Sequence, residues 1–597
     1  MPTGLPEGVG LVEQVLLAVV AGVGFCVLLM MVHAPLGGHV FSNAFVVPVV
    51  GAAVLVWGLL RKRWPRSVPW LMVVLFAIVL LAIFETPVLQ EGTGVRAGDS
   101  SLHMGWTEQL LRGESVPPGP APEFARNAYP WGFHTVMATM VRLVPGTDTF
   151  AAQEGLHILL LLALPLGCAC LARRLYGSSG WAAALCASVV AGWGWISARG
   201  IDFVASPLNA RHGADMVAAS PNSVYELFPP AFPRELGLVV LSATGLLIVL
   251  AIRTEDRRFG FLAGISAGIV GLVSAPLFLT AAIWTVVGAL LAGARARLRM
   301  FVTLAGPTLL VFALWAVPVA YNYIRYGGFV NITSRLGVEW PVVIALASWG
   351  LLLPLAVAGI VMAVRSSTTG ARVLLSFALV AVAMLALSRA RAAFDWQLGG
   401  NATALHQGRV WPVAHLLGAA FAGAALATGF DWLRRRSEFM APVAVAVVAV
   451  VGSLSLWLSS QGLSRVIHND DNGFIYNRPE FANGSFIRNA AEVLGPDDIV
   501  EAPSGPDNVL GFWLFQFSGV RVTGHDDPRY LGNELRIRYR ELARRYAEVM
   551  AEGGFDADYV ALLEVDAVDA GIDADAVVAA GPFNGRRWVL VEAGALD

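Results

Sequence analysis

The residues best suited to chemistry lie in one polar stretch, from Gly98 to Thr135, which follows three strongly apolar segments. Its ionisable side chains are Asp99, His103, Glu108, Arg112, Arg126 and His134. A carboxylate that stands just past an apolar helix can take a proton from a substrate hydroxyl group, so Asp99 is a candidate general base. The competing interpretation is that Asp99 only caps a helix by accepting a backbone N–H hydrogen bond.

A second set of charged residues stands at the starts of two later apolar runs. Arg234 and Glu235 open one run, while His406 and Arg409 lie three residues apart before another. Arginine forms bidentate, charge-assisted hydrogen bonds with phosphate, which makes Arg409 a candidate ligand of a lipid phosphate, helped by Arg234 and His406. Anchoring of these long side chains among lipid headgroups is the alternative.

Other polar residues near these clusters are candidate substrate contacts. They are His103, Tyr129, His134, Glu235 and Asp395. Four aspartates, Asp99, Asp202, Asp215 and Asp395, could bind a divalent cation through their oxygens. No contiguous Asp-x-Asp occurs in these segments, so no metal ligand is assigned.

The composition around these clusters is that of a polytopic membrane protein. Of the 597 residues, 56% are hydrophobic and 14% are charged. Apolar runs of about 20 residues, the length that crosses a bilayer, recur from Leu11 to Ser460. The net charge of −2 gives no basic face for nucleic acid, and we find neither a P-loop nor a dinucleotide fingerprint. The four cysteines lie in apolar runs and suggest neither a disulfide framework nor a zinc site.

The predicted fold is α-helical, with about 13 transmembrane helices. The spans are expected near residues 11–33, 44–60, 69–86, 153–172, 180–197, 235–252, 259–274, 276–293, 300–322, 340–364, 372–388, 411–430 and 439–460. Short arginine-rich loops, such as 253–258, 295–299 and 434–436, mark the cytoplasmic side. The N-terminus is then cytoplasmic, the first span is retained rather than cleaved, and the long polar loops face outwards.

One apolar run, 131–144, is too short to be a span and would reverse the charge pattern if it crossed the membrane. We therefore expect two interfacial helices in the first outer loop, at about 100–112 and 131–144. Residues 1–460 then form a transmembrane domain, and residues 461–597 form a small extracytoplasmic α/β domain. In this tail, β-like runs occur at 499–500, 520–523, 559–563 and 588–591, and an amphipathic helix is predicted at 534–552.

The acidic residue in the first outer loop, the surface helix, and the element Tyr129-Pro-Trp-Gly-Phe-His134 together resemble the integral-membrane glycosyltransferases of the C-type (GT-C) fold. The likeness covers residues 65–460 and is greatest to actinobacterial arabinosyl- and mannosyltransferases of cell-wall biogenesis. It implies a polyprenyl-phosphate sugar donor, with Asp99 as the catalytic base. The chain departs from some relatives because Asp99 is not paired with a second carboxylate and Val273-Ser-Ala-Pro276 stands where His-Pro would be expected.

The function predicted from these features is inverting transfer of a sugar from a polyprenyl-phosphate donor to a glycan or lipid acceptor, at the outer face of a bacterial cytoplasmic membrane. Two alternatives stay open. A lipid or polysaccharide transporter would place ionisable residues midway along its spans, whereas several spans here contain none. A non-enzymatic membrane scaffold is compatible with the same topology.

Overall fold

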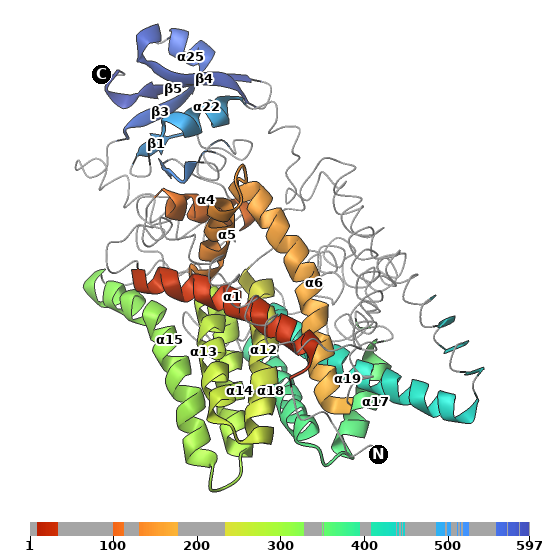
Figure 1. Cartoon of the computed structure of the whole chain (residues 1–597). Coiled ribbons are helices and arrows are strands. Elements are labelled where there is room, and N and C mark those ends of the chain that lie inside the picture. Colours follow the sequence, from red (N-terminus) through yellow and green to blue (C-terminus); the bar gives the residue numbers. More distant parts are fainter. Residues whose placement is uncertain are drawn as a thin grey trace.

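The computed structural model describes residues 9–33, 99–112, 130–176, 233–326, 349, 352–393, 407–437, single positions between 439 and 450, 485–495, 498–502, 510, 514, 518–523, 557–569, 571–583 and 586–595, apart from individual side chains. These residues form three layers (Figure 1): a bundle of long helices, two short helices α4 and α5 above it, and a C-terminal α/β unit on top.

The bundle is made of apolar helices. They are α1 (Leu11–His33), α6 (Thr149–Tyr176), α12 (Pro233–Thr254), α13 (Arg257–Val273), α14 (Ala275–Leu291), α15 (Arg297–Tyr326), α17 (Leu352–Val364), α18 (Thr369–Ala393) and α19 (Gln407–Arg436). Within the described residues, five helices are long and apolar enough to cross a membrane: Thr149–Tyr176, Pro233–Thr254, Arg297–Ala320, Thr369–Ala390 and Val410–Arg436. The chain therefore has the architecture of a multi-pass membrane protein.

The observed helices coincide with the spans predicted near 11–33, 153–172, 235–252, 259–274, 276–293, 300–322, 372–388 and 411–430, and with the second half of 340–364. The spans expected at 44–60, 69–86 and 180–197, and most of 439–460, lie outside the described residues. The count of 13 therefore stays a prediction.

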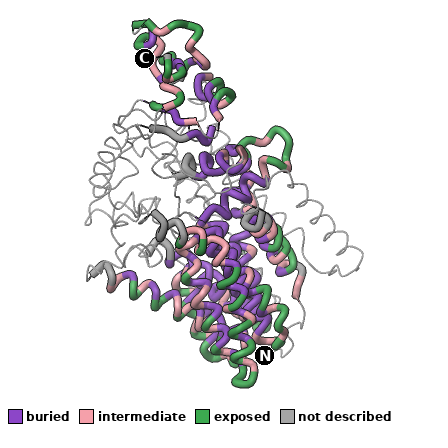
Figure 2. Tube along the Cα trace, turned by 90° about the vertical axis from the view of Figure 1, so that its left-hand side faces the viewer, coloured by how far each residue is buried: buried purple, intermediate pink, exposed green. Residues whose placement is uncertain are grey.

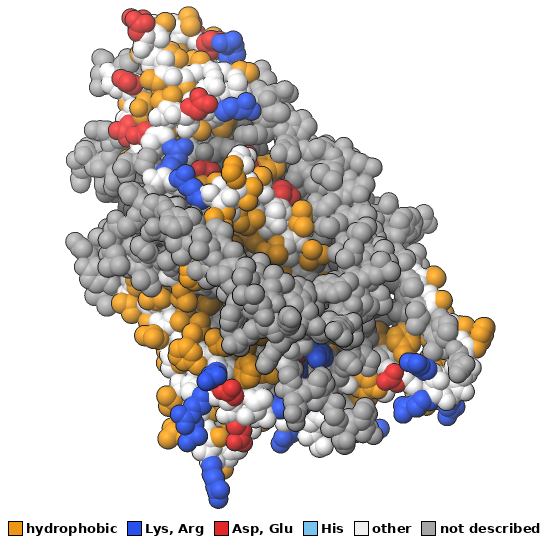
Figure 3. Space-filling view, in the orientation of Figure 1, with side chains coloured by type: hydrophobic (Ala, Val, Ile, Leu, Met, Phe, Trp, Pro, Cys, Tyr) orange, Lys and Arg blue, Asp and Glu red, His pale blue; other side chains and the backbone are white. Residues whose placement is uncertain are grey.

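Helix α12 is the centre of the bundle, because nearly all of its side chains are buried. On α15, by contrast, Leu309, Leu310 and Val317 are exposed by 62%, 72% and 63%. Figure 3 likewise shows hydrophobic side chains at the surface of the lower left part of the bundle. Such exposed apolar faces fit contact with lipid rather than water.

Glycines let neighbouring helices of the bundle approach closely. A Cβ atom built on Gly264 of α13 would clash with the carbonyl oxygen of Leu304 on α15. One built on Gly359 of α17 would clash with the carbonyl oxygen of Phe421 on α19. Any larger residue would force these backbones apart, as is common where membrane helices pack through small residues.

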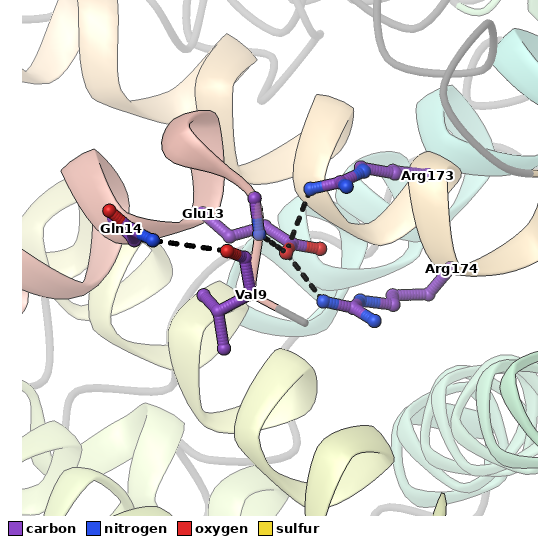
Figure 4. A network of polar contacts seen from close by, with 6 residues as sticks. Val9, Glu13, Gln14, Arg173 and Arg174 are labelled. Atoms are coloured by element: carbon purple, nitrogen blue, oxygen red, sulfur yellow. Dashed lines mark hydrogen bonds and ion pairs between the residues drawn. The ribbon is translucent and has the colours of Figure 1, made fainter. Parts of the chain in front are cut away.

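A buried charged network joins the beginning of α1 to the end of α6 (Figure 4). Glu13 is fully buried, and its Oε2 atom accepts hydrogen bonds from Arg173 at 3.0 Å, Arg174 at 2.5 Å and the backbone N–H of Gly10 at 2.7 Å. The carbonyl oxygen of Arg174 also lies against Gly370 at the start of α18. The three helix ends are thus held together on one side of the bundle.

We call this side the arginine end. Besides Arg173 and Arg174, it carries the turns at 253–258, 292–299 and 365–372 and the end of α19 at 434–436. Arginine side chains are seen at the lower tip of the bundle in Figure 3. The opposite side, which we call the site end, holds the starts of α12 and α14 and the junction at Ser274.

Helices α4 (Asp99–Leu111) and α5 (Gly132–Leu143) form where short helices were expected. With 13 and 12 residues they are about 20 and 18 Å long, too short to cross about 30 Å of hydrocarbon. Residues 132–139 of α5 are all buried. Buried positions run from the bundle through this layer (Figure 2).

The C-terminal α/β unit, residues 485–595, contains a mixed sheet in the order β2-β1-β3-β5-β4. Its elements are α22 (Ser485–Val493), β1 (Ile499–Glu501), β2 (Arg521–Thr523), β3 (Tyr559–Leu563), α25 (Glu564–Asp569), β4 (Val577–Phe583) and β5 (Arg586–Glu592), with single 3-10 turns at Ala574–Ala576 and Ala593–Ala595. Strands β1, β2, β3 and β5 coincide with the predicted β-like runs. The helix predicted at 534–552 lies outside the described residues.

Candidate functional site

The described part of the site is built around two histidines, one on each short helix. The Nδ1 atom of His103 on α4 lies 2.9 Å from the Nε2 atom of His134 on α5. Both side chains are buried, with exposed fractions of 5% and 1%. The aromatic rings of Trp106 and Phe133 contact both imidazoles. Burial, and then the neighbouring His103, hold the pKa of His134 well below its usual value, which favours the neutral form of the His134 ring.

Trp131, Gly132 and His134, in the element that runs from Tyr129 to His134, have a structural explanation. Gly132 lies so close to the end of α13 that an added Cβ would be 2.5 Å from the carbonyl oxygen of Leu272. Thr135 bonds back to the carbonyl oxygen of Trp131 at 3.0 Å. Glycine therefore anchors α5 on the bundle, and the histidine two residues later is brought to His103.

Asp99 is the first residue of α4. Residues 99 and 103 are one helical turn apart, which puts the candidate base and His103 on the same side of that helix. The side chain of Asp99 lies outside the described residues, and its role as base or cap stays a prediction.

Arg234 and Glu235 form an ion pair at the beginning of α12. The guanidinium donates through Nε at 2.7 Å and approaches through Nη2 at 2.5 Å, both to Oε1 of Glu235. Glu235 is 2% exposed, and its Oε2 atom has no hydrogen-bond partner among the described residues. The Glu235 carboxylate therefore neutralises much of the positive charge of Arg234, which makes Arg234 a weaker ligand for phosphate.

The start of α12 and the histidine pair lie at the same end of the bundle. Gly237 of α12 packs on Ser274, and Gly132 of α5 packs on Leu272, two residues earlier in the same junction between α13 and α14. Glu235 stands two residues before the first of these contacts, and His134 two residues after the second.

Arg409 is the third residue of α19, and its side chain is outside the description. The far end of α19 is fixed at the arginine end, where the Tyr176 hydroxyl group donates to Asp431 at 2.9 Å. The 22 residues from Arg409 to Asp431 correspond to about 33 Å of helix. Arg409 therefore belongs to the site end, as do Asp99, His103, His134, Arg234 and Glu235.

Three predicted site residues, Tyr129, His406 and Asp395, lie outside the described residues. Among the described residues there is no group of three or more His, Cys, Asp or Glu side chains that could hold a metal ion. Of the four aspartates considered for a divalent cation, the structure describes only the backbone of Asp99.

Sequence reasoning gave no role to Glu108 and Arg112, which lie one turn apart on α4. Burial raises the pKa of Glu108 to about 7, and the nearby Asp148 adds to the rise, while Arg112 and Arg142 oppose it. Arg142 of α5 donates to the carbonyl oxygen of Leu111 at 2.8 Å. A glutamate four residues before an arginine was the available signal, but only the fold reveals its burial.

Comparison with known proteins gives structural neighbours only, since no protein-family model and no curated protein matches the chain. ArnT from Cupriavidus metallidurans bound to undecaprenyl phosphate is 15% identical, with a TM-score of 0.49 over 87% of this chain and 98% of that one. The Archaeoglobus fulgidus oligosaccharyltransferase in the apo form is 11% identical, with a TM-score of 0.49 over 82% and 69% of the two chains.

The arabinosyltransferase EmbB from Mycobacterium smegmatis is 15% identical, with a TM-score of 0.35 over 72% of this chain and 45% of that one. These neighbours are C-type glycosyltransferases, in agreement with the resemblance drawn from the sequence. All three TM-scores are below 0.5, so the likeness carries no argument about the reaction.

Proposed function

We propose that this protein is a glycosyltransferase that moves a sugar from a polyprenyl-phosphate donor to a cell-envelope glycan or lipid acceptor. The donor lipid lies along the bundle, with its phosphate at the site end. The N-terminus and the arginine end face the cytoplasm, so the site end and the C-terminal α/β unit are extracytoplasmic.

Asp99 acts as the general base. The acceptor hydroxyl group gives its proton to the Asp99 carboxylate, and its oxygen bonds to the anomeric carbon of the donor sugar. The bond between that carbon and the phosphate oxygen breaks on the opposite face, so polyprenyl phosphate leaves with the electron pair and the configuration inverts. Because Asp99 is the first residue of α4, this surface helix can hold the carboxylate at a fixed distance from the acceptor hydroxyl group.

The leaving phosphate is stabilised by Arg409, with His406 and Arg234 as secondary contacts. An arginine can hold two phosphate oxygens in a fixed geometry, which favours the charge that develops as the bond breaks. Arg409 has the main role because the guanidinium of Arg234 is engaged with Glu235.

The sugar and the acceptor contact His103, His134, Tyr129, Glu235 and Asp395. Imidazole nitrogens can donate or accept hydrogen bonds, which suits His103 and His134, next to the proposed base, to contact with sugar hydroxyl groups. Glu235 presents a buried carboxylate oxygen to which a sugar hydroxyl can donate. A divalent cation is not required by this scheme.

The observation that supports the proposal is that the predicted base, the histidine pair and the predicted phosphate ligands come from separate segments whose ends gather at one end of the bundle, opposite the arginine end. A transporter would need its ionisable residues along the path through the bundle. Within the described spans, the charged residues stand at the helix ends.

The test is a transfer assay with the purified chain in proteoliposomes and a panel of polyprenyl-phosphate pentoses and hexoses. Release of polyprenyl phosphate is expected with the wild type and is expected to disappear in Asp99→Asn, while the size-exclusion profile stays unchanged. Asp566→Asn, an exposed acid-to-amide change on α25, is the matched control and should keep full activity. Undiminished transfer in Asp99→Asn would remove Asp99 from the mechanism.

A further inference from the structure

The C-terminal α/β unit and the first-loop helix share a hydrophobic core. Trp106 of α4 is only 5% exposed, and it packs into a cluster that contains Phe486 and Ile487 of α22 and Leu590 of β5. Since the indole is buried inside the unit's own core, α4 is structurally part of that unit although almost 400 residues separate them.

A second contact fastens the other end of α4. The guanidinium of Arg112 donates through Nη2 to the carbonyl oxygen of Ala491 at 3.1 Å and through Nη1 to that of Leu494. Ala491 lies in the last turn of α22 and Leu494 directly follows the helix; at this end, backbone acceptors lack partners within the helix and the helix dipole favours a cation. Arg112 thus serves as a cap for α22 provided from another layer of the molecule.

A third contact is made by backbone. Gly519 has φ of +69°, a conformation that disfavours a side chain. A Cβ added to Gly519 would lie 2.8 Å from the backbone nitrogen of Gln109 and 3.1 Å from the carbonyl carbon of Glu108. The loop before β2 therefore rests directly on α4, and only glycine allows this.

The same helix leads to the candidate site. The ring of Trp106 contacts His103 at 5.6 Å and His134 at 5.2 Å between ring centroids. The indole thus contacts both histidines while the residue belongs to the C-terminal core. Asp99 lies less than two turns away on the same helix.

We propose that the C-terminal α/β unit holds the first-loop helix in place, and that Arg112 and Gly519 are positioning residues for the reaction at Asp99. This inference rests on the proposed function for its catalytic part only. Its structural part, that the unit fixes α4, stands on the three contacts and can be tested without any substrate.

The structural test is hydrogen exchange of the full-length protein in nanodiscs, read over residues 103–111. Arg112→Ala removes both hydrogen bonds to α22 and is expected to speed exchange of these amides about tenfold, while helices of the bundle exchange as before. Arg488→Ala, an exposed charge on α22 itself, is the control and should change nothing in α4. Unchanged exchange in Arg112→Ala would overturn the inference.

The catalytic test is single-turnover kinetics with the donor for which transfer is found. A smaller folded fraction lowers only the amplitude, whereas a displaced α4 lowers the rate constant. Arg112→Ala and Gly519→Ala should each lower the rate constant about tenfold, and Arg112→Lys, which can still reach one carbonyl, should recover part of it. A loss of amplitude alone would reduce Arg112 to a stabilising role.

The two proposals can fail separately. If the wild type transfers no sugar but Arg112→Ala speeds amide exchange in α4, the proposed function is wrong, and the inference that the C-terminal unit holds α4 in place is right. If Asp99→Asn abolishes transfer while both Arg112→Ala and Gly519→Ala leave the exchange rate and the rate constant unchanged, the proposed function stands. The inference about the C-terminal unit is then wrong.

Discussion

The Nδ1 atom of His103 lies 2.9 Å from the Nε2 atom of His134, and this contact ties α4 to α5 inside a shell of aromatic rings. Truncation of His134 removes the hydrogen bond and leaves a cavity at a site that is 1% exposed. We expect His134→Ala to lower the free energy of unfolding by about 2–4 kcal/mol, measured by denaturant titration in detergent. His134→Gln, which keeps a donor and an acceptor, should lose clearly less, and equal losses would show that packing alone matters.

Acid should weaken the same contact. The pKa of His134 lies well below the ordinary 6.5, chiefly because the ring is buried. Below pH 6.5 the unfolded chain therefore binds a proton that the folded chain cannot, so the free energy of unfolding falls as the pH decreases towards the folded-state pKa. The difference in unfolding free energy between wild type and His134→Gln should shrink between pH 7 and pH 5. A constant difference over that range would contradict a neutral, buried imidazole.

For Glu108 we expect the opposite pH dependence of the free energy of unfolding. Its pKa is raised from 4.5 to about 7 by burial, so the folded chain binds a proton that the unfolded chain has already released. The stabilisation is present below pH 4.5 and is lost as the pH rises through about 7. Glu108→Gln keeps the neutral form and should have a higher melting temperature than wild type at pH 8 but not at pH 4.5. The exposed Glu492→Gln on α22 is the control and should behave as wild type at both values.

Periodicity and charge in the sequence predicted the long helices that the structure describes and the two short ones, because a run of apolar residues and the arginines that end it are local features. Strand β4 was missed for a local reason as well. Its Ala-Ala-Gly-Pro core has weak β propensity, and Pro582 is tolerated only because β4 is the edge strand beside β5.

The site shows where local information ends. The spacing of Asp99, His103 and His134 indicated one polar segment. It did not predict that the two imidazoles are in contact, or that Trp106 belongs to the C-terminal core. Both facts depend on contacts between residues that are 31 and about 380 positions apart. The contact of Arg112 with α22 could not be predicted from side-chain types either, because its acceptors are backbone carbonyl oxygens.

The network at the arginine end should be essential for a stable fold. Glu13→Gln removes the only carboxylate that the described residues place against Arg173 and Arg174, and leaves a 4% exposed arginine without its counter-charge. Loss of one partner of a buried pair costs about 3–5 kcal/mol, so we expect a large drop in the melting temperature of the detergent-solubilised protein. Gln14→Ala, on the exposed neighbour, should cost little. Wild-type stability in Glu13→Gln would mean that the arginines find other acceptors.

Arg409 provides the sharpest test of how the donor is held. If its guanidinium binds the lipid phosphate, Arg409→Ala should weaken donor affinity by one to two orders of magnitude, since a hydrogen bond to a charged group is worth about 1.5–3 kcal/mol. Arg234→Ala should weaken it less, because Glu235 already engages that guanidinium at 2.7 and 2.5 Å. Arg434→Ala, on the same helix at the arginine end, is the matched control. Affinity is measured by titration of a non-transferable polyprenyl-phosphate analogue into each variant in nanodiscs. If Arg234→Ala instead weakens donor affinity more than Arg409→Ala does, the phosphate binds at the start of α12 rather than at the start of α19.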